Sequence, residues 1–234
     1  MSAGDAAERR EQLVSLYKEV SSCTKCPLYE TRTKAVFGAG NADADLMFVG
    51  EAPGAEEDRQ GLPFVGRAGQ LLNQMLEEIG LSREDVFICN VLKSRPPNNR
   101  DPLPAEIAAC EPYLWEQVRL IEPRVVCTLG NFATKLLTGS QTGITRVHGT
   151  PQTHQLGGRT VFILPIFHPA AALRTPAVKE QLRADFATLP ALLERALPAP
   201  MPSAEELAEA QAGPAVEEPP PPADQLGFFG ESAG

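Results

Sequence analysis

The stretch LMFVGEAPGAEEDRQGLPFVGRAGQLLNQMLEEIG, residues 46–80, combines an apolar run, a loop rich in glycine and acids, and a segment with helical spacing. The apolar run at residues 45–50 has the nearly continuous character of a strand that is covered on both faces. One helical face of the last segment is apolar, and Gly80 is placed to end that helix. The apolar positions are Leu71, Leu72, Met75, Leu76 and Ile79. A second apolar run follows at residues 86–91, so the stretch predicts a βαβ unit.

The same alternation continues along the chain. Two further apolar runs lie at residues 124–129 and 160–167, and helical patterns lie at residues 7–20, 104–121, 131–137 and 179–193. Strands that alternate with helices are typical of a three-layer α/β/α domain with a short, mainly parallel central sheet and right-handed crossovers. We therefore expect one α/β domain over residues 1–195.

The remaining residues, 196–234, are rich in Pro, Ala and Glu and have too little apolar surface to offset the entropy of ordering, so we expect a disordered tail. The formal net charge of −9 is unevenly distributed along the chain. Seven of the 30 acids and none of the 21 bases follow Arg195, which leaves 23 acids against 21 bases in the first 195 residues. A domain so close to neutral is compatible with local basic patches and a nucleic-acid partner.

No stretch approaches the ~18 consecutive apolar residues of a membrane span, and the N-terminus is charged where a signal peptide would be apolar. We expect a cytoplasmic protein without a membrane partner, whose five cysteines stay reduced. Cys23 and Cys26 form a CxxC motif, which is a metal or redox spacing, whereas Cys89 and Cys127 lie inside apolar runs and are expected in the core.

Ligands of parallel α/β sheets bind outside the carboxyl ends of the strands, which here selects the loops that begin at Gly50, Asn90, Gly130 and His168. The first of these loops has neither GxGxxG nor the GxxxxGK pattern of a phosphate cradle, and its four acids would repel phosphate. The acids can instead accept hydrogen bonds from a neutral substrate, hold water or a cation, or stabilise positive charge in a transition state.

The acids of this loop are not equivalent. Glu51 directly follows the strand, and we expect it to point into the crevice. Glu56, Glu57 and Asp58 can also be solvated acids at a helix N-terminus, and for Glu56 we prefer this interpretation.

Three other side chains are candidates for binding a flat polar ligand. Phe64 can stack on a ring or can anchor its loop to the core. Asn90 has the donor and acceptor needed to read the edge of a nucleobase or amide, or it ties down the turn after its strand. His168, fixed by Pro169 at a strand end, is placed to donate a hydrogen bond to a developing anion. The weaker candidates, His148 and His154, lie in an expected hairpin or loop.

Taken in order, the motifs resemble the family 4 uracil-DNA glycosylases, the iron–sulfur branch of the uracil-DNA glycosylase superfamily. The matching motifs are GEAPGAEEDRQGLPFVGRAGQLL, NVLKSRPPNNRDPLP and the HP of FHPAAALR, together with the CxxC and Cys110, over roughly residues 20–190. The resemblance implies a uracil-DNA glycosylase-like fold in a monomer. It also implies a monofunctional enzyme that flips uracil out of DNA and hydrolyses its N-glycosidic bond, leaving an abasic site.

The resemblance also implies a role for each candidate. Phe64 would stack on the uracil ring, Asn90 would read its edge, and His168 would stabilise negative charge on the O2 side. Glu51 and Glu57 would position water or offset the positive charge of the sugar. Two more residues match family positions near the substrate, namely Ala52 and Asn99.

A 4Fe–4S cluster is implied in the same way, with Cys23, Cys26 and Cys110 as ligands. The family usually has a fourth cysteine where this chain has Ser94. Either the serine is a ligand, Cys89 or an outside group substitutes, or the cluster is labile or absent. Two other departures from the family are Ala170, usually serine, and His148, usually arginine.

The last residues include QLGFF, in which Gln225, Leu226, Phe228 and Phe229 resemble the Gln-Leu-x-Leu/Phe-Phe peptides that bind bacterial sliding clamps. A disordered tether that carries such a peptide would attach the domain to the replication sliding clamp.

Two other functions fit the residues without the resemblance. The first is a metal-stabilised α/β hydrolase or lyase acting on a small molecule, with Glu51 and His168 as its acid–base pair. The second is a non-catalytic module that binds DNA or a clamp.

Overall fold

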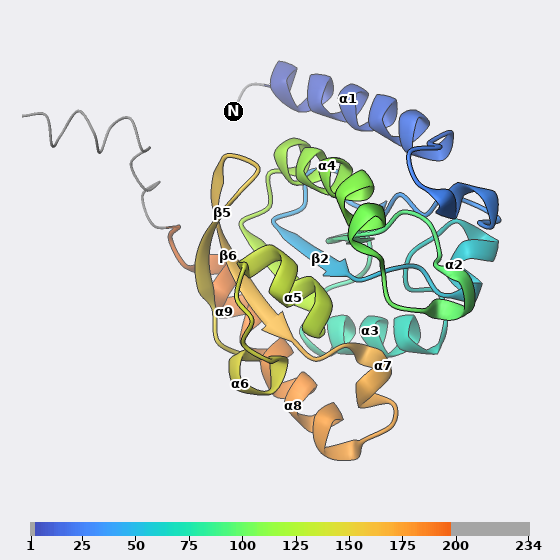
Figure 1. Ribbon diagram of the computed structural model, residues 1–234. Helices are drawn as coiled ribbons and strands as arrows, with labels where there is room; N and C mark the ends of the chain where they lie inside the picture. Colours follow the sequence, from blue (N-terminus) through green and yellow to red (C-terminus); the bar gives the residue numbers. More distant parts are fainter. Residues whose placement is uncertain (1–2, 198–234) are drawn as a thin grey trace, which may run out of the picture. The chain divides into compact units, whose positions relative to one another are not determined.

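A six-stranded sheet runs through the computed structural model, which describes residues 3–197 (Figure 1). The strand order is β1-β3-β2-β4-β6-β5. The four inner strands correspond to the four predicted apolar runs, and neighbours among them pair in parallel. They are β2 (Leu46–Gly50), β3 (Phe87–Asn90), β4 (Val125–Leu129) and β6 (Arg159–Ile166). The predicted fold class, α/β with a mainly parallel sheet, is confirmed.

Two antiparallel strands form the edges of the sheet; the sequence did not predict the first, and it placed His154, which lies in the second, only in a hairpin or loop. β1 (Ala39–Gly40) pairs with β3, and β5 (Gln152–Leu156), which contains His154, pairs with β6. The β5–β6 hairpin turns at Gly157 and Gly158, whose φ angles of 56° and 79° are the left-handed values that tight hairpin turns require. β5 is polar and partly exposed, so it has no apolar run that would predict it.

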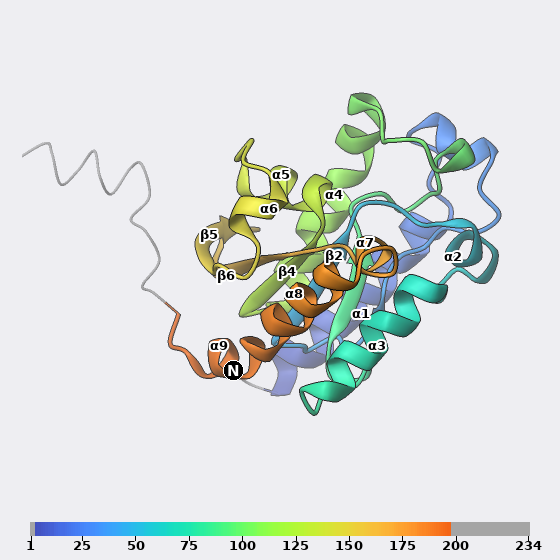
Figure 2. The ribbon, with the colours of Figure 1, turned by 90° about the horizontal axis from the view of Figure 1, so that it is seen from below.

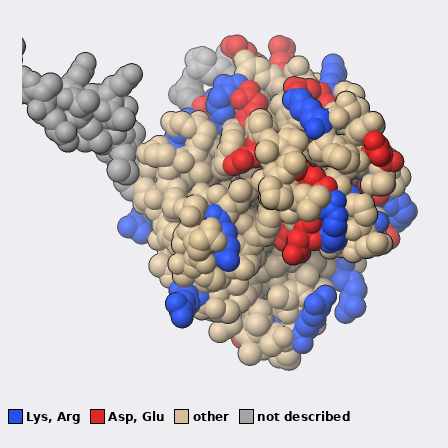
Figure 3. All heavy atoms as spheres, in the orientation of Figure 1, with Lys and Arg blue, Asp and Glu red and all other residues tan. Residues whose placement is uncertain are grey.

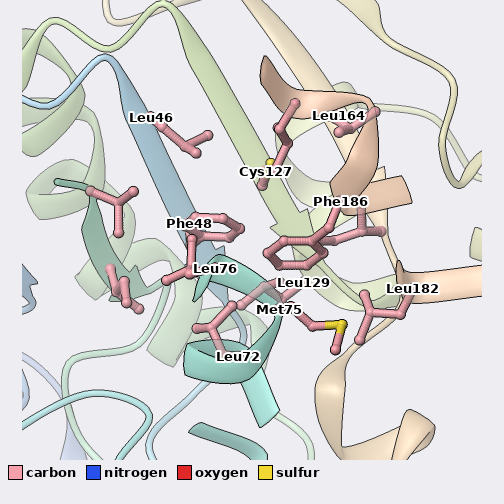
Figure 4. Packing of buried hydrophobic residues seen from close by; sticks show 14 of the residues in the cluster. Leu46, Phe48, Leu72, Met75, Leu76, Cys127, Leu129, Leu164, Leu182 and Phe186 are labelled. Atoms are coloured by element: carbon pink, nitrogen blue, oxygen red, sulfur yellow. The ribbon is translucent and has the colours of Figure 1, made fainter. Parts of the chain in front are cut away.

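Three helices cover one face of the sheet: α3 (Arg67–Glu78), α8 (Pro176–Ala187) and α9 (Leu189–Glu194). On this face the rings of Phe48 and Phe186 stack with centroids 5.6 Å apart and planes 13° apart (Figure 4). The strand and helix side chains form one continuous apolar core that fixes the ends of the strands.

The opposite face is covered by α1 (Ala3–Ser21), α4 (Pro104–Ile121) and α5 (Asn131–Thr138). Met47 and Val49 of β2 point to this side, because successive side chains of a strand point to opposite faces. Figures 1 and 2 show α1 and α4 on one side of the sheet and α3 and α8 on the other. Both faces are therefore buried, as the continuous apolar runs predict.

The prediction of one helix over residues 179–193 was wrong. The structure has two helices, α8 and α9, that meet at Thr188. Pro190 follows at the second position of α9, where the missing N–H of proline is tolerated but where the preceding helix cannot continue.

Short helices interrupt the connecting segments: η1 (Pro27–Glu30), α2 (Ala55–Gln60), η2 (Pro97–Asn99), α6 (Ile144–Val147) and α7 (Pro169–Ala172). No helix within residues 3–197 has the length and apolar character that would cross a membrane. The predicted clamp peptide, with Gln225, Leu226, Phe228 and Phe229, lies outside the described residues, and the predicted domain boundary at residue 195 stays a prediction.

Candidate active site

A cavity of about 300 Å³ lies at the carboxyl end of the sheet, beside the ends of β2, β3 and β6. Three loops that are far apart in the sequence supply its walls, as expected where parallel strands end together. The lining residues are Ala52, Gly54, Glu57, Phe64, Ala68, Asn90, Asn99, His168 and Ala170. The structure thus brings Phe64, Asn90 and His168 to one cavity.

Asn90 ends β3 beside Gly50, the last residue of β2. A Cβ atom at Gly50 would lie 2.3 Å from Asn90 Oδ1 and 2.8 Å from Phe64 Cζ, so glycine leaves the space that both side chains use. Asn90 is 2% exposed, and its Oδ1 has no hydrogen-bond partner in the described part of the chain. A buried acceptor without a partner costs roughly 1–3 kcal/mol. A ligand with a donor group would remove this cost.

Lys93 holds the backbone of Asn90 from the interior. Its buried Nζ donates to Asn90 O at 2.7 Å and to Gln117 Oε1 at 2.6 Å, and burial lowers the pKa of this amine. Gln117 in turn donates to Phe37 O at 2.9 Å. The end of β3 is therefore tied to α4 directly beneath the cavity.

Phe64 is both a core residue and a cavity residue. Its ring is 6% exposed, belongs to the core cluster on the α3 side, and lies 5.6 Å from the His168 ring between centroids. Its backbone φ of 51° is left-handed, which is uncommon for a side chain of this size. The loop therefore holds the ring in place against a backbone preference.

His168 caps the N-terminus of α7, and its Nδ1 accepts a hydrogen bond from the Ala170 N–H at 3.1 Å. Nδ1 is therefore the acceptor, and the proton of the neutral ring lies on Nε2. Burial lowers the pKa of His168 to about 4, although the negative charge of Glu57 opposes this shift. The imidazole is neutral at pH 7 and can donate one hydrogen bond through Nε2.

The two acids expected to act on the substrate have different environments. Glu57 lines the cavity, and its Oε1 accepts hydrogen bonds from Val65 N at 3.0 Å and Gly66 N at 3.1 Å. Glu51 is half-buried and is not among the cavity-lining residues. Burial raises the pKa of Glu51, and the nearby negative charge of Asp101 raises it further.

The other two acids of the loop, Glu56 and Asp58, are not among the residues that line the cavity. Glu56 is exposed and pairs with Arg59 at 2.6 Å, as expected for a solvated acid. The solvated interpretation of Asp58 is wrong, because this side chain is 5% exposed and accepts from Thr33 N at 2.9 and 3.1 Å. Asp58 thereby fixes the start of the segment that leads into β1.

The remaining predicted contacts, Ala52 and Asn99, both reach the cavity wall. Asn99 has a left-handed φ of 53°, and its Oδ1 accepts from Arg95 Nε at 2.7 Å. Its amide oxygen is therefore already used within the η2 loop, and its amide nitrogen remains as a donor.

The matching family model, described as the uracil DNA glycosylase superfamily, covers residues 37–189, more than half of the chain and all of the cavity-lining positions. A type-4 uracil-DNA glycosylase from Archaeoglobus fulgidus is 47% identical over 180 residues, which cover 75% of this chain and 90% of that protein. The chain belongs to the type-4 uracil-DNA glycosylases. A type-4 relative from Thermotoga maritima is 50% identical over 167 residues, 70% of this chain and 85% of that protein. A type-5 relative from Pyrobaculum aerophilum matches only 40% of this chain, at 36% identity.

The resemblance to the type-4 glycosylases implies a cluster held by Cys23, Cys26 and Cys110. The structure places two of these cysteines in one cluster of buried residues. Cys26 and Cys110 lie in one small buried cluster with Leu28 and Leu92, whereas Cys89 lies in the core on the α4 side. Cys89 and Cys127 are both fully buried, as predicted. Cys89 therefore belongs to the core of this type-4 chain.

The fourth position of the donor set that the resemblance implies for this type-4 chain holds Ser94 rather than a cysteine. Within residues 3–197 no group of three or more His, Cys, Asp or Glu side chains is arranged to hold a metal ion. Ser94 is buried, and its Oγ accepts a hydrogen bond from Arg32 Nη1 at 3.0 Å. The hydroxyl of Ser94 is therefore held in place by Arg32.

Sequence reasoning missed several residues that shape the site of this type-4 glycosylase. Gly54 and Ala68 line the cavity, but small side chains leave no chemical signal in a sequence. Lys93 lies two residues after the apolar run of residues 86–91, and because lysine is rarely buried, this pattern does not predict an amine in the interior.

Proposed function

We propose that this chain is a monofunctional DNA-repair enzyme that hydrolyses the N-glycosidic bond of uracil in DNA and leaves an abasic site. The observation that carries the proposal is the shared cavity of an aromatic ring, an unpartnered buried amide oxygen and a neutral imidazole donor. Membership of the type-4 uracil-DNA glycosylases supports the same reaction. A base can enter this cavity only after it leaves the duplex, as in other enzymes that act on bases.

We propose that Phe64 and Asn90 recognise the extruded base. The Phe64 ring stacks on the pyrimidine, an interaction worth roughly 1–3 kcal/mol per base. Asn90 Oδ1 accepts from the uracil N3–H, and Asn90 Nδ2 donates to O4. Since Oδ1 has no protein partner among the described residues, the uracil N–H would supply the missing hydrogen bond.

We propose that His168 assists bond breaking. As the bond between N1 and C1′ breaks, its electron pair moves onto the base and negative charge develops at O2. The Nε2–H of neutral His168 donates to O2, which stabilises this charge. Glu51 and Glu57 hold the water that adds to C1′ or offset the positive charge of the sugar, and Ala52 and Asn99 contact the substrate.

A more basic part of the surface supports a DNA partner. Figure 3 shows side chains of both signs in the upper part and the centre of the face, whereas the lower part has Lys and Arg at its margins and almost no Asp or Glu. Arg146 and Arg174 come from this region, and neither makes a salt bridge within the described residues. Such side chains suit phosphate contacts, which position DNA without reading its sequence.

The test is an oligonucleotide with one uracil, incubated with the protein and then treated with alkali to cleave abasic sites. We expect cleavage at the uracil and none at a thymine in the same place. His168→Ala should abolish cleavage while largely preserving binding, and His154→Ala on β5 is the matched control.

Other outcomes of this assay point to the other functions. Binding without cleavage by the unaltered protein would match a non-catalytic DNA-binding module. Neither binding nor cleavage would match a hydrolase or lyase that acts on a small molecule.

We also propose that Cys23, Cys26 and Cys110 supply three thiolates to a 4Fe–4S cluster, and that Ser94 makes this cluster easier to lose. The test is the iron and sulfide content and the visible absorbance of the protein, compared with Ser94→Cys. We expect the variant to keep its iron longer during dialysis against a chelator. Equal loss from both proteins would contradict the proposal.

A last proposal concerns partners. The QLGFF peptide would bind the replication sliding clamp. The enzyme itself would act as a monomer, and it would act in the cytoplasm. Clamp binding measured by titration should fall when Phe228 and Phe229 are both changed to alanine, while uracil release stays unchanged. Unchanged clamp affinity would contradict this assignment.

A further inference from the structure

Arg83 lies in the turn between α3 and β3 and reaches the loop that carries Phe64. Its Nη2 donates to Pro63 O at 2.7 Å, and its Nη1 donates to Phe64 O at 3.0 Å and to Asn73 Oδ1 at 3.1 Å. The guanidinium therefore bonds two successive backbone carbonyls and one side chain of α3.

Arg83 uses its charge in an unusual way. It forms none of the ion pairs between described residues, and burial lowers its pKa without a compensating carboxylate. Placing a cation in a half-buried position without an anion has a free-energy cost, which the fixed carbonyl dipoles offset. Most arginines on a protein surface are solvated or paired with a carboxylate, so the position of Arg83 is unusual.

Glu57 holds the other side of the same loop. Its Oε1 accepts from the amides of Val65 and Gly66, directly after the carbonyls that Arg83 bonds. The peptide group between Phe64 and Val65 is thus held from both ends, its oxygen by the cation of Arg83 and its N–H by the anion of Glu57. Gly69 completes the arrangement, because a Cβ there would lie 1.8 Å from Phe64 O.

These contacts explain how Phe64 keeps a left-handed backbone. Its φ of 51° is disfavoured for a side chain with a Cβ, and such conformations persist only where the surroundings fix them. We infer that Arg83 is a positioning residue that, together with Glu57 and Gly69, fixes the Phe64 ring against the extruded base. This inference rests on the proposed function for its kinetic consequence, but not for its structural one.

The structural test is hydrogen exchange of the full chain, followed on peptides that cover residues 61–69. Arg83→Met removes all three hydrogen bonds and retains the length of the stem. We expect faster exchange in the Phe64 loop and unchanged exchange in β2 and β4. Unchanged exchange in the loop would overturn the inference whether or not the protein releases uracil.

The kinetic test measures kcat and KM on a uracil-containing oligonucleotide. Because stacking holds the base in the bound complex as well as in the transition state, Arg83→Met should raise KM about tenfold and change kcat little. Arg83→Lys retains the charge but loses the planar fork, so its KM should lie between those of the other two proteins.

A double-mutant cycle shows whether Arg83 acts through Phe64. In a Phe64→Leu background, Arg83→Met should cause almost no further loss, because the ring it positions is gone. Multiplying losses would overturn the inference. The matched control is Arg119→Met on α4, on the opposite face of the sheet, which breaks the pair with Glu116 and should leave KM unchanged.

Discussion

His168 has its protonation state set by its surroundings. The Ala170 N–H fixes Nδ1 as an acceptor, and burial keeps the ring neutral far below neutral pH. A donor that is already neutral can stabilise a developing anion without first losing or gaining a proton. The same burial makes His168 a measurable contributor to acid sensitivity.

We expect the free energy of unfolding to fall as pH drops from about 6.5 to about 4. The folded-state pKa of His168 is about 4, below the ordinary value of 6.5. Between these two pH values the imidazole binds a proton in the unfolded chain but not in the folded protein, so protonation favours unfolding. The loss amounts to about 3 kcal/mol. Urea unfolding at pH 7 and pH 4.5 should show a smaller loss for His168→Ala, and equal losses would refute the assignment.

Gly50 tests how closely the ends of β2 and β3 fit together. Gly50→Ala would force Asn90 Oδ1 and the Phe64 ring to move, and we expect kcat/KM for uracil release to fall about 100-fold. Gly143→Ala is the matched control, because a Cβ there meets nothing within 4 Å. Similar kinetics for the two variants would show that the fit is not needed.

The residues that sequence analysis brings forward are those whose chemistry is visible without a partner. Asn90 and His168 stand out because each lies at the end of an apolar run, and Phe64 stands out as an aromatic residue in a loop flanked by glycines. Asp58 and Arg83 do not stand out, because their partners are backbone groups tens of residues away or hidden in a loop. A sequence shows a side chain but not the peptide groups it bonds.

At the scale of elements, α7 links the cavity to the surface. His168 precedes this four-residue helix, and Leu173, which ends it, is 41% exposed. Two more exposed leucines, Leu62 and Leu103, follow a similar pattern, because each lies within four residues of a cavity-lining position. Exposed apolar side chains beside a base pocket suit insertion between base pairs.

We expect Leu173→Ala to lower kcat/KM about tenfold on double-stranded DNA and little on single-stranded DNA, since only a duplex must be opened. The measurement is uracil release from the same oligonucleotide with and without its complement. Val14→Ala on α1 also removes an exposed apolar side chain and should affect neither substrate. Equal losses on both substrates would exclude a role in opening the duplex.

The inner elements were predictable because their apolar patterns are continuous or periodic over several residues. All four parallel strands and the long helix α4 follow their patterns closely. β1 has only two residues, and β5 alternates half-exposed polar residues, so their pairing depends on neighbours rather than on their own composition. The break at Thr188 follows from Pro190, which the apolar periodicity of residues 179–193 does not report.

At the scale of the whole molecule, the net charge conceals a nearly neutral domain with a more basic side (Figure 3). Each phosphate contact contributes about −0.9 to the slope of log affinity against log salt concentration. Changing Arg146 and Arg174 to glutamine should therefore reduce the magnitude of this slope by about 2. Binding isotherms at several salt concentrations test this, and an unchanged slope would place the phosphates elsewhere.

The cavity itself is a property of the whole fold. Its nine lining residues span positions 52–170, and only the parallel topology brings the three loops together. Sequence reasoning could place the site at the strand ends by this rule, but not its volume or the bonds around Phe64. Those depend on side-chain packing, which follows from the complete set of contacts.

The edge strand β5 has a consequence for handling the protein at high concentration. It covers the open side of β6, whose VFILPI segment is almost entirely buried and strongly apolar. Polar residues on β5 make a poor template for another chain, whereas a bared β6 would recruit strands from other molecules. We therefore expect β5 to protect β6 from pairing with other molecules when the protein is concentrated.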